Sequence, residues 1–152
     1  MLLLAAVLFA AGWLTRENPA EKPYLAILGG GFIFNYRVAE AFYGFTAQLQ
    51  KPVKAGSTIE AEFENPAGGP PIREEARIRM PATRYSLRSP PLTGIKAGKP
   101  YRVVIRLYDY TGKKLIEEQE RFYTSRLDSK FVPEQPLTVG PGYDLNPNSP
   151  IR

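Results

Sequence analysis

Residues 95–112 read IKAGKPYRVVIRLYDYTG, and the fold prediction starts from this segment. From Tyr101 onward, apolar side chains alternate with mostly polar ones. One face of the extended chain carries Tyr101, Val103, Ile105 and Leu107, and the other carries Arg102, Val104, Arg106 and Tyr108. This period of two is typical of a β-strand with one buried face. Turn residues near Asp109 to Lys113 then predict a hairpin with a second strand over residues 115–125, where Glu117, Glu118 and Glu120 favour an edge position.

The residues that lead into this strand resemble a motif of known domains. Ile95, Gly98 and Tyr101 match the tyrosine corner of fibronectin type III and other immunoglobulin-like domains, in which the tyrosine hydroxyl bonds back to the preceding loop. The antibody-type Cys and Trp pattern is absent, since the chain has no Cys and its one Trp is Trp13. The resemblance implies an antiparallel immunoglobulin-like sandwich of the fibronectin kind.

Other segments support an all-β fold. Residues 57–64 alternate, with Ile59, Ala61 and Phe63 expected inward and three glutamates outward. Residues 72–80 alternate again, with arginines on the outer face, so the acidic and basic rows are expected to meet across neighbouring strands. Tyr85 and Leu87 continue a strand that ends at Pro90. We therefore predict an antiparallel immunoglobulin-like sandwich over residues 24–126, with an N-terminal apolar helix and an extended C-terminal arm.

Residues 24–50 contain two features with competing interpretations. Gly29, Gly30 and Gly31 follow an apolar strand, but no Lys-Ser/Thr and no helix start follows them, so a turn or bulge is preferred to a phosphate-binding loop. Residues 32–50 are rich in aromatic side chains, whose alternation changes phase near Ala39. Two strands or one bulged strand are predicted, with a helix as the competitor. An exposed ring such as Phe42 is a candidate for stacking on a ligand.

The two ends of the chain differ from the middle. Met1 to Leu14 is apolar and uncharged, and residues 1–15 are predicted to be a signal or membrane-anchor segment. As a helix the run is about 21 Å long, less than the roughly 30 Å hydrocarbon core. A buried segment of a soluble protein is the alternative. Residues 16–23 are a polar linker, and residues 127–152 are a Pro-rich arm without regular structure that is either disordered or docked on the domain.

The charges that flank the apolar N-terminal run conflict with the expected export of the domain. No basic residue precedes the apolar run, whereas Arg16 and Lys22 follow it, and this bias alone puts the C-terminal side in the cytoplasm. An upstream basic segment would remove the conflict. We expect a cell-envelope location, on the periplasmic or extracellular side, with the protein membrane-anchored through residues 1–14 or secreted after cleavage.

The composition excludes several chemistries. The absence of Cys and His rules out disulfides, thiolate or imidazole metal sites and a Ser-His-Asp arrangement. Residues 71–106 hold nine Lys or Arg and two Glu, so the excess positive charge is local. This stretch is interpreted either as a solvated strand face or as a site for anionic partners. No metal, no cofactor and no catalytic residue is predicted.

The functional expectation is a non-catalytic, envelope-exposed module for protein interaction or scaffolding, with another envelope protein as partner. One alternative is a binding module for an anionic or carbohydrate ligand, and another is an enzyme with no recognisable site. Nucleic-acid binding is not favoured, since the aromatic and Arg-rich stretches are separate. The candidate ligand-binding residues are Arg77, Arg79, Arg84, Arg88 and Phe42.

Overall fold

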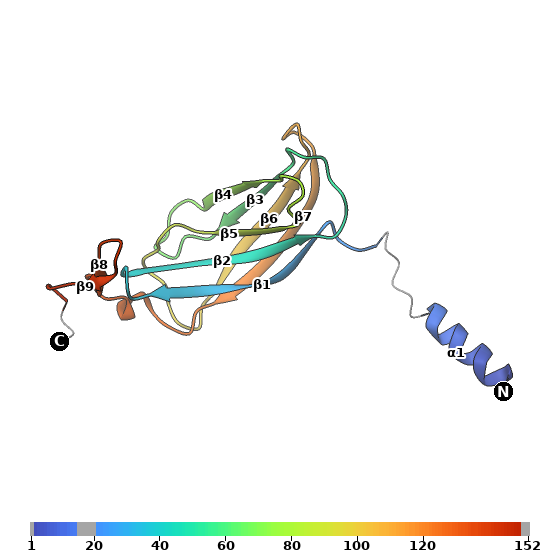
Figure 1. Ribbon diagram of the computed structural model, residues 1–152, viewed down its shortest axis with the longest axis horizontal. Helices are drawn as coiled ribbons and strands as arrows, with labels where there is room; N and C mark the ends of the chain where they lie inside the picture. The colour runs from blue at the N-terminus through green and yellow to red at the C-terminus, as the bar shows by residue number, and fades with distance from the viewer. Residues whose placement is uncertain (1, 15–20, 150–152) are drawn as a thin grey trace.

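The computed structural model describes residues 2–14 and 21–149, and its regular structure is almost entirely antiparallel β (Figure 1). A single α-helix, α1 (Leu2–Leu14), precedes the strands. The strands are β1 (Leu25–Asn35), β2 (Glu40–Leu49), β3 (Thr58–Phe63), β4 (Ile72–Arg77), β5 (Arg84–Arg88), β6 (Pro100–Tyr108), β7 (Leu115–Thr124), β8 (Thr138–Val139) and β9 (Asp144–Leu145). The predicted all-β class is confirmed.

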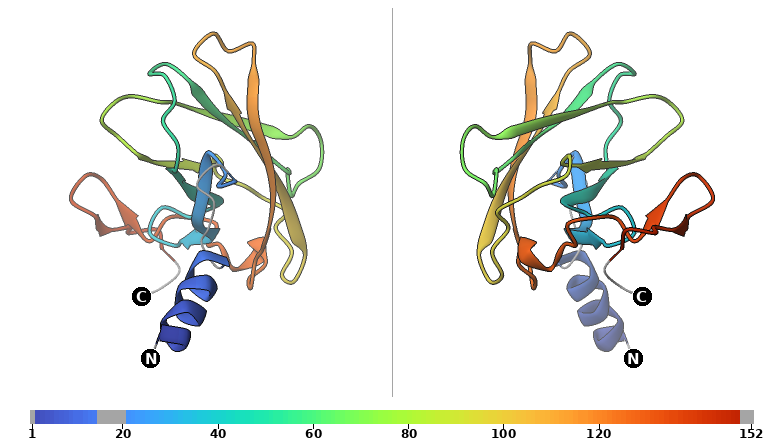
Figure 2. Two further views of the ribbon diagram at one scale, coloured as in Figure 1. Left: turned by 90° about the vertical axis from the view of Figure 1, so that its right-hand side faces the viewer. Right: turned by 90° about the vertical axis from the view of Figure 1, so that its left-hand side faces the viewer.

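The first seven strands form two sheets. One sheet has the order β1-β2-β5 and the other the order β4-β3-β6-β7, and every neighbouring pair is antiparallel. The pairs β2-β5 and β3-β6 join strands that are not consecutive in the chain, so the connections cross between the sheets. Seen from the ends, the two sheets lie as two layers (Figure 2). β5 and β7 are edge strands, and the edge position expected for residues 115–125 is confirmed.

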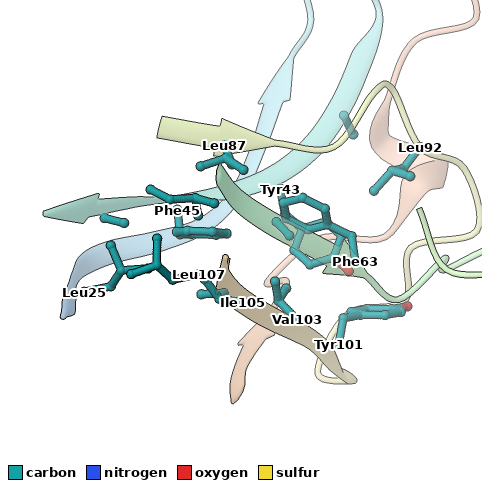
Figure 3. Packing of buried hydrophobic residues seen from close by; sticks show 14 of the residues in the cluster. Leu25, Tyr43, Phe45, Phe63, Leu87, Leu92, Tyr101, Val103, Ile105 and Leu107 are labelled. Atoms are coloured by element: carbon teal, nitrogen blue, oxygen red, sulfur yellow. The ribbon is translucent and has the colours of Figure 1, made fainter. Parts of the chain in front are cut away.

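The core fills the space between the two layers (Figure 3). Inward positions come from both sheets: Leu25, Tyr43, Phe45 and Leu87 from one, and Ile59, Phe63, Tyr101, Val103, Ile105 and Leu107 from the other. The Tyr43 and Phe63 ring centroids are 5.1 Å apart and edge-on, a favoured aromatic geometry. The buried Tyr43 hydroxyl donates to the Glu64 carbonyl oxygen at 2.6 Å, and burial raises the pKa of this phenol.

Residues 101–108 form the predicted strand with one buried face. Tyr101, Val103, Ile105 and Leu107 are fully buried, while Arg102 on the opposite face is exposed. The Tyr101 hydroxyl accepts a hydrogen bond from the Lys96 N–H at 2.8 Å, which is the contact expected of a tyrosine corner. Asp109 closes the following hairpin, because its N–H donates to the Lys114 carbonyl oxygen and its carboxylate binds the turn residues.

Charged side chains pair across the outer face of the four-stranded sheet. Arg106 binds three carboxylates from two neighbouring strands: Glu60 at 3.1 Å, Glu62 at 3.3 Å and Glu118 at 2.7 Å. Arg73 on β4 also binds Glu62, so acidic and basic side chains do meet across neighbouring strands. These four interactions account for much of the acidic row on β3. Arg77, at the far end of β4, forms no ion pair with any described residue.

The inner face of β7 is partly polar. Phe122 would be expected inside on hydropathy alone, but its side chain is 58% exposed. Glu117 and Gln119 point inward instead, because they pair with Leu107 and Ile105, whose side chains are buried. Glu117 accepts hydrogen bonds from the Tyr24 and Leu25 N–H groups, and the Gln119 amide donates to the Leu25 carbonyl oxygen at 2.6 Å. These polar side chains satisfy the backbone where β1 begins.

The glycine run lies inside β1 and does not end it. The strand continues to Asn35, with a register shift between Ile27 and Gly29 that confirms the predicted bulge. A turn over residues 36–39 separates β1 from β2, as the change of phase near Ala39 predicted. The aromatic segment is therefore two paired strands, and the helical alternative is wrong.

The C-terminal arm contains some regular structure, contrary to expectation. A 3-10 turn spans Ser129–Phe131, and β8 and β9 form a short hairpin. The arm is docked, because the Ser129 N–H donates to the Ile95 carbonyl oxygen and the Leu137 N–H donates to the Tyr36 carbonyl oxygen. The described helix and the arm lie beyond opposite ends of the two sheets (Figure 1). The predicted linker, residues 16–23, falls mostly outside the described residues, and no described helix is long and apolar enough to cross a membrane.

Candidate functional site

A groove with a volume of about 490 Å³ lies along the three-stranded sheet. We call it the glycine groove, because three of its residues come from the glycine run of β1 and a fourth glycine comes from β2. It is lined by Gly29, Gly30, Gly31, Phe32, Ile33, Phe42, Gly44, Phe45, Thr46, Ser86, Leu87 and Arg88. The lining therefore draws on all three strands of the sheet.

The glycines have two different roles in this groove. A Cβ atom at Gly44 would lie 2.4 Å from the Leu87 carbonyl oxygen, and one at Gly30 would lie 2.5 Å from the Gly44 carbonyl oxygen. Neither position has room for a side chain. At Gly29, in contrast, a Cβ atom would meet nothing within 4 Å. Packing thus requires glycine at positions 30 and 44, whereas glycine at position 29 leaves open space in the groove.

Arg88 and Phe42 form one end of the groove. The Arg88 guanidinium carbon lies 4.6 Å from the centre of the Phe42 ring, within the range of a cation–π contact. Phe42 is only 8% exposed, so the expectation of an exposed stacking ring is wrong: the ring is covered where Arg88 lies over it. Among the described residues Arg88 forms no ion pair, so its charge is available to a ligand.

The rest of the lining mixes hydroxyl and apolar groups. The Thr46 and Ser86 hydroxyl oxygens are 3.0 Å apart and face each other across β2 and β5. Ile33 presents a side chain that is 54% exposed. Arg88 is the one charged side chain of the lining. Glu74 and Glu75 share a neighbouring hollow with Arg88, but neither forms an ion pair with it among the described residues. The groove can therefore donate hydrogen bonds, attract an anion and cover apolar surface, but its residues supply no general base.

The predicted site residues separate into two groups. Arg88 and Phe42 line the glycine groove, whereas the other three arginines lie where β4 ends and β5 begins. Arg77 is paired with Thr58, Arg84 with Gln48, and Arg79 lies in the connection between the two strands. The Tyr85 hydroxyl accepts from the Arg79 N–H at 3.0 Å and holds this connection. The five residues thus do not form one site.

Sequence reasoning missed the glycines and hydroxyls of the groove as site residues. The glycine run itself was visible, but its interpretation as a bulge did not show which face would be left open. Thr46 and Ser86 carried no signal, because they are 40 residues apart and become neighbours only through the β2-β5 pairing. No cluster of three or more metal-binding side chains occurs in the described part of the chain.

The glycine groove is thus a hollow on the three-stranded sheet that offers a cation, hydroxyl groups and apolar surface to a ligand. Comparison with known proteins gives no information about the ligand of the groove. No model of a known protein family, no curated protein and no solved structure matches this chain.

Proposed function

We propose that this protein is a non-catalytic interaction module of the cell envelope that binds a segment of another protein in the glycine groove. The observation that carries the proposal is the composition of the groove. Open space over Gly29 lets an extended backbone approach the sheet closely, and the neighbouring hydroxyls of Thr46 and Ser86 offer hydrogen bonds to it. The positive charge of Arg88, which forms no ion pair among the described residues, favours a segment with an acidic residue near the Phe42 end.

A carbohydrate ligand is less well supported. Sugar rings stack on exposed aromatic faces, and Phe42, the ring predicted for this role, is covered by Arg88. An anionic ligand remains the second candidate, since Arg88 lies exposed in the groove without an ion-pair partner among the described residues. Phosphate or carboxylate groups on a small molecule would use the same guanidinium that we assign to an acidic side chain.

We further propose that the fold is an immunoglobulin-like sandwich of the fibronectin kind. Seven antiparallel strands in sheets of three and four, with the Tyr101 hydroxyl bonded to the loop before its strand, support this type. The fourth strand pairs with the third, which makes the β4-β3-β6-β7 sheet the larger one. Many unrelated functions use this fold, so it does not select the ligand.

The envelope location rests on the sequence of α1. Its thirteen residues are apolar, and the described side chains of Leu8, Phe9 and Trp13 are 65%, 72% and 64% exposed. An exposed apolar surface of this kind is stable when lipid or protein covers it. Cell fractionation, combined with the mass of the mature N-terminus, distinguishes an anchored protein from a cleaved or a cytoplasmic one.

Photocrosslinking tests the groove directly. A photoreactive amino acid replaces Ser86 inside the groove, or exposed Thr124 on β7 as the matched position outside it, and the full chain is irradiated in its native membranes. We expect a discrete protein adduct from position 86 and none of the same mass from position 124. Adding Gly29→Leu should remove the adduct, because the new side chain occupies the open space without meeting backbone.

Two outcomes contradict the proposal. Identical adducts from positions 86 and 124 would mean that capture does not depend on the groove. An adduct from position 86 that survives Gly29→Leu would mean that the partner does not occupy the groove. A thermal unfolding curve for Gly29→Leu that matches the parent curve is the control that separates a filled groove from a damaged fold.

A further inference from the structure

A second surface lies at the end of the domain where β1 begins. Five segments that are distant in the sequence meet there: residues 21–24, the β2-β3 loop, the β4-β5 connection, the first residue of β5 and the β6-β7 turn. We call this surface the basic end. Besides Glu21 and Lys22, which carry opposite charges, it holds the cations Lys51, Lys54, Arg77, Arg79, Arg84, Lys113 and Lys114. All seven except Lys51, which is partly buried, are exposed.

Backbone hydrogen bonds hold these segments together. The Gly56 N–H donates to the Ile78 carbonyl oxygen, which joins the β2-β3 loop to the β4-β5 connection. The Leu49 N–H donates to the Thr83 carbonyl oxygen, which brings the end of β2 to the start of β5. Lys54 lies with its ammonium group 4.6 Å from the centre of the Tyr110 ring, so the β6-β7 turn belongs to the same end.

Six of these seven cations are not neutralised by carboxylates within the described structure. Within the described residues, Lys54, Arg77, Arg79, Arg84, Lys113 and Lys114 form no ion pair. In contrast, Arg73, Lys99, Arg102 and Arg106 on the outer face of the four-stranded sheet are each bound to a carboxylate. Two acids at this end are already bound. The Asp109 carboxylate accepts hydrogen bonds within its own turn, first from the Thr111 hydroxyl, and these bonds lower its pKa. Glu117 accepts hydrogen bonds from the Tyr24 and Leu25 N–H groups. The basic end thus presents a net positive face.

Aromatic side chains and a hollow accompany this charge. Tyr24 and Tyr110 line a cavity of about 400 Å³ together with Val53, Lys54 and Lys114. Lys51 lies 5.0 Å from the centre of the Tyr24 ring. Tyrosine and lysine together suit the boundary between water and lipid, since the ring enters the interface while the ammonium group meets headgroups.

We propose that the basic end rests on an anionic lipid surface and fixes the orientation of the domain on the membrane. The chain enters the domain here, at Tyr24, ten residues after the apolar helix α1 ends at Leu14. Ten residues span at most about 35 Å, so an anchor in lipid keeps this end close to the headgroups. The inference rests on the proposed anchoring by residues 1–14 and is independent of the glycine groove.

This orientation has a geometric consequence. The C-terminal hairpin β8-β9 lies at the end of the two sheets away from the basic end and would point away from the bilayer (Figure 1). The glycine groove runs along a side of the domain and stays accessible to a partner. A nucleic acid would also be attracted to seven cations, but it would not account for an adjoining apolar helix.

The test uses the full chain on vesicles. The chain has no cysteine, so Ala55→Cys in the β2-β3 loop and Gln135→Cys in the arm each accept a single fluorophore. Vesicles of phosphatidylcholine alone, or with one third phosphatidylglycerol, carry a quencher in the headgroup region. We expect quenching at position 55 on anionic vesicles only, and no quenching at position 135. Added salt should reverse the effect, because it screens exposed charges.

Charge reversal identifies the surface responsible. Lys54→Glu with Lys114→Glu should reduce quenching at position 55 to the level of neutral vesicles, since each cation near an anionic surface strengthens binding by about fivefold. The matched control, Lys96→Glu with Arg126→Glu, changes the net charge equally at exposed positions away from the basic end and should leave quenching unchanged.

Each other outcome overturns the inference. Quenching at position 55 that is equal on neutral and anionic vesicles, or equally reduced by both variant pairs, excludes a role for the basic end. Charge-dependent binding to duplex DNA with no response to lipid charge assigns the surface to nucleic acid. If the protein binds both vesicle types without quenching at position 55, anchoring by residues 1–14 is supported but the role of the basic end is excluded. If the protein binds neither vesicle type, both proposals are excluded.

Discussion

The Tyr101 hydroxyl and the Lys96 backbone are joined by a 2.8 Å hydrogen bond that ties β6 to the loop before it. Tyr101 is fully buried, with its ring 5.4 Å from that of Phe32 on the opposite sheet. The same side chain therefore contributes to the core and restrains a connection between the layers. Its partner is a backbone group, so the contact does not depend on the identity of residue 96.

The Tyr101 contact predicts a specific loss of stability. Tyr101→Phe retains the ring but leaves the Lys96 N–H without its partner, which should lower the free energy of unfolding by about 1–2 kcal/mol. Urea unfolding followed by intrinsic fluorescence measures the change. Tyr123→Phe is the matched control, because in the described structure the Tyr123 hydroxyl is buried and has no hydrogen-bond partner. Equal losses in the two variants would contradict the assigned role of the Tyr101 hydroxyl.

Neighbouring glycines of β1 should respond differently to alanine. A Cβ atom at Gly30 would lie 2.5 Å from the Gly44 carbonyl oxygen and 2.7 Å from the Tyr123 ring, so Gly30→Ala should cost about 1–3 kcal/mol. Gly29→Ala meets open space, and it should leave stability unchanged or raise it slightly, since it reduces the freedom of the unfolded chain. Thermal unfolding of the two variants gives the comparison. A melting temperature for Gly30→Ala equal to that of the parent would refute the close packing of β1 on β2.

Arg106 should matter more to stability than Arg102. The Arg106 side chain is 21% exposed and binds Glu60, Glu62 and Glu118, which together raise the pKa of its guanidinium. Arg106→Gln leaves three carboxylates close together and should cost about 2 kcal/mol, below the roughly 3–5 kcal/mol of a fully buried pair. Arg102 is 54% exposed and pairs with Glu120 alone, so Arg102→Gln should cost at most about 1 kcal/mol. Urea unfolding at low and high salt measures the stability lost in each variant, and this loss should depend more strongly on salt for Arg106→Gln than for Arg102→Gln. A stronger salt dependence for Arg102→Gln would argue against the network.

Glu64 should make stability depend on pH in the acid range. The Arg102 N–H, followed by Lys99, lowers the pKa of the Glu64 carboxyl below its usual 4.5. A group whose pKa is lowered by folding stabilises the native state fully above its unfolded pKa, and loses this effect as the pH falls through its folded pKa. Glu64→Gln should therefore reduce the loss of stability between about pH 5 and the acid limit of folding. Melting temperatures from pH 7 to pH 3 test this, with exposed Glu75→Gln as the control; parallel curves for parent and Glu64→Gln would exclude the effect.

The strands were predictable where one face is buried and the other is polar. The alternation in residues 58–63 and 101–108 has a period of two, and Ile59, Phe63 and Ile105 are fully buried as expected. β7 was harder, because its inward Glu117 and Gln119 are polar and bind the backbone of β1. A hydropathy pattern cannot distinguish such side chains from solvated ones, since the partner lies over 90 residues away in the chain.

The candidate site was only partly predictable. Arg88 and Phe42 were singled out for charge and ring, but nothing local showed that the guanidinium would cover the ring. Arg77, Arg79 and Arg84 were grouped with Arg88 because they are near it in sequence. The β4-β5 connection instead carries them to the basic end, beside Lys54 and Lys114. The nearness of charges along a chain does not fix their nearness in space.

The all-β class, the positions of most strands and the Tyr101 contact could be predicted from the sequence, because burial of one strand face and a five-residue loop are local constraints. The glycines that leave an open groove, the hydroxyls that line it and the cations that gather at one end of the domain were recognisable only in the folded structure. Those features arise from the β2-β5 pairing and from loop contacts between distant segments. Such pairings depend on the free energy of the whole packed core, which no single stretch of residues contains.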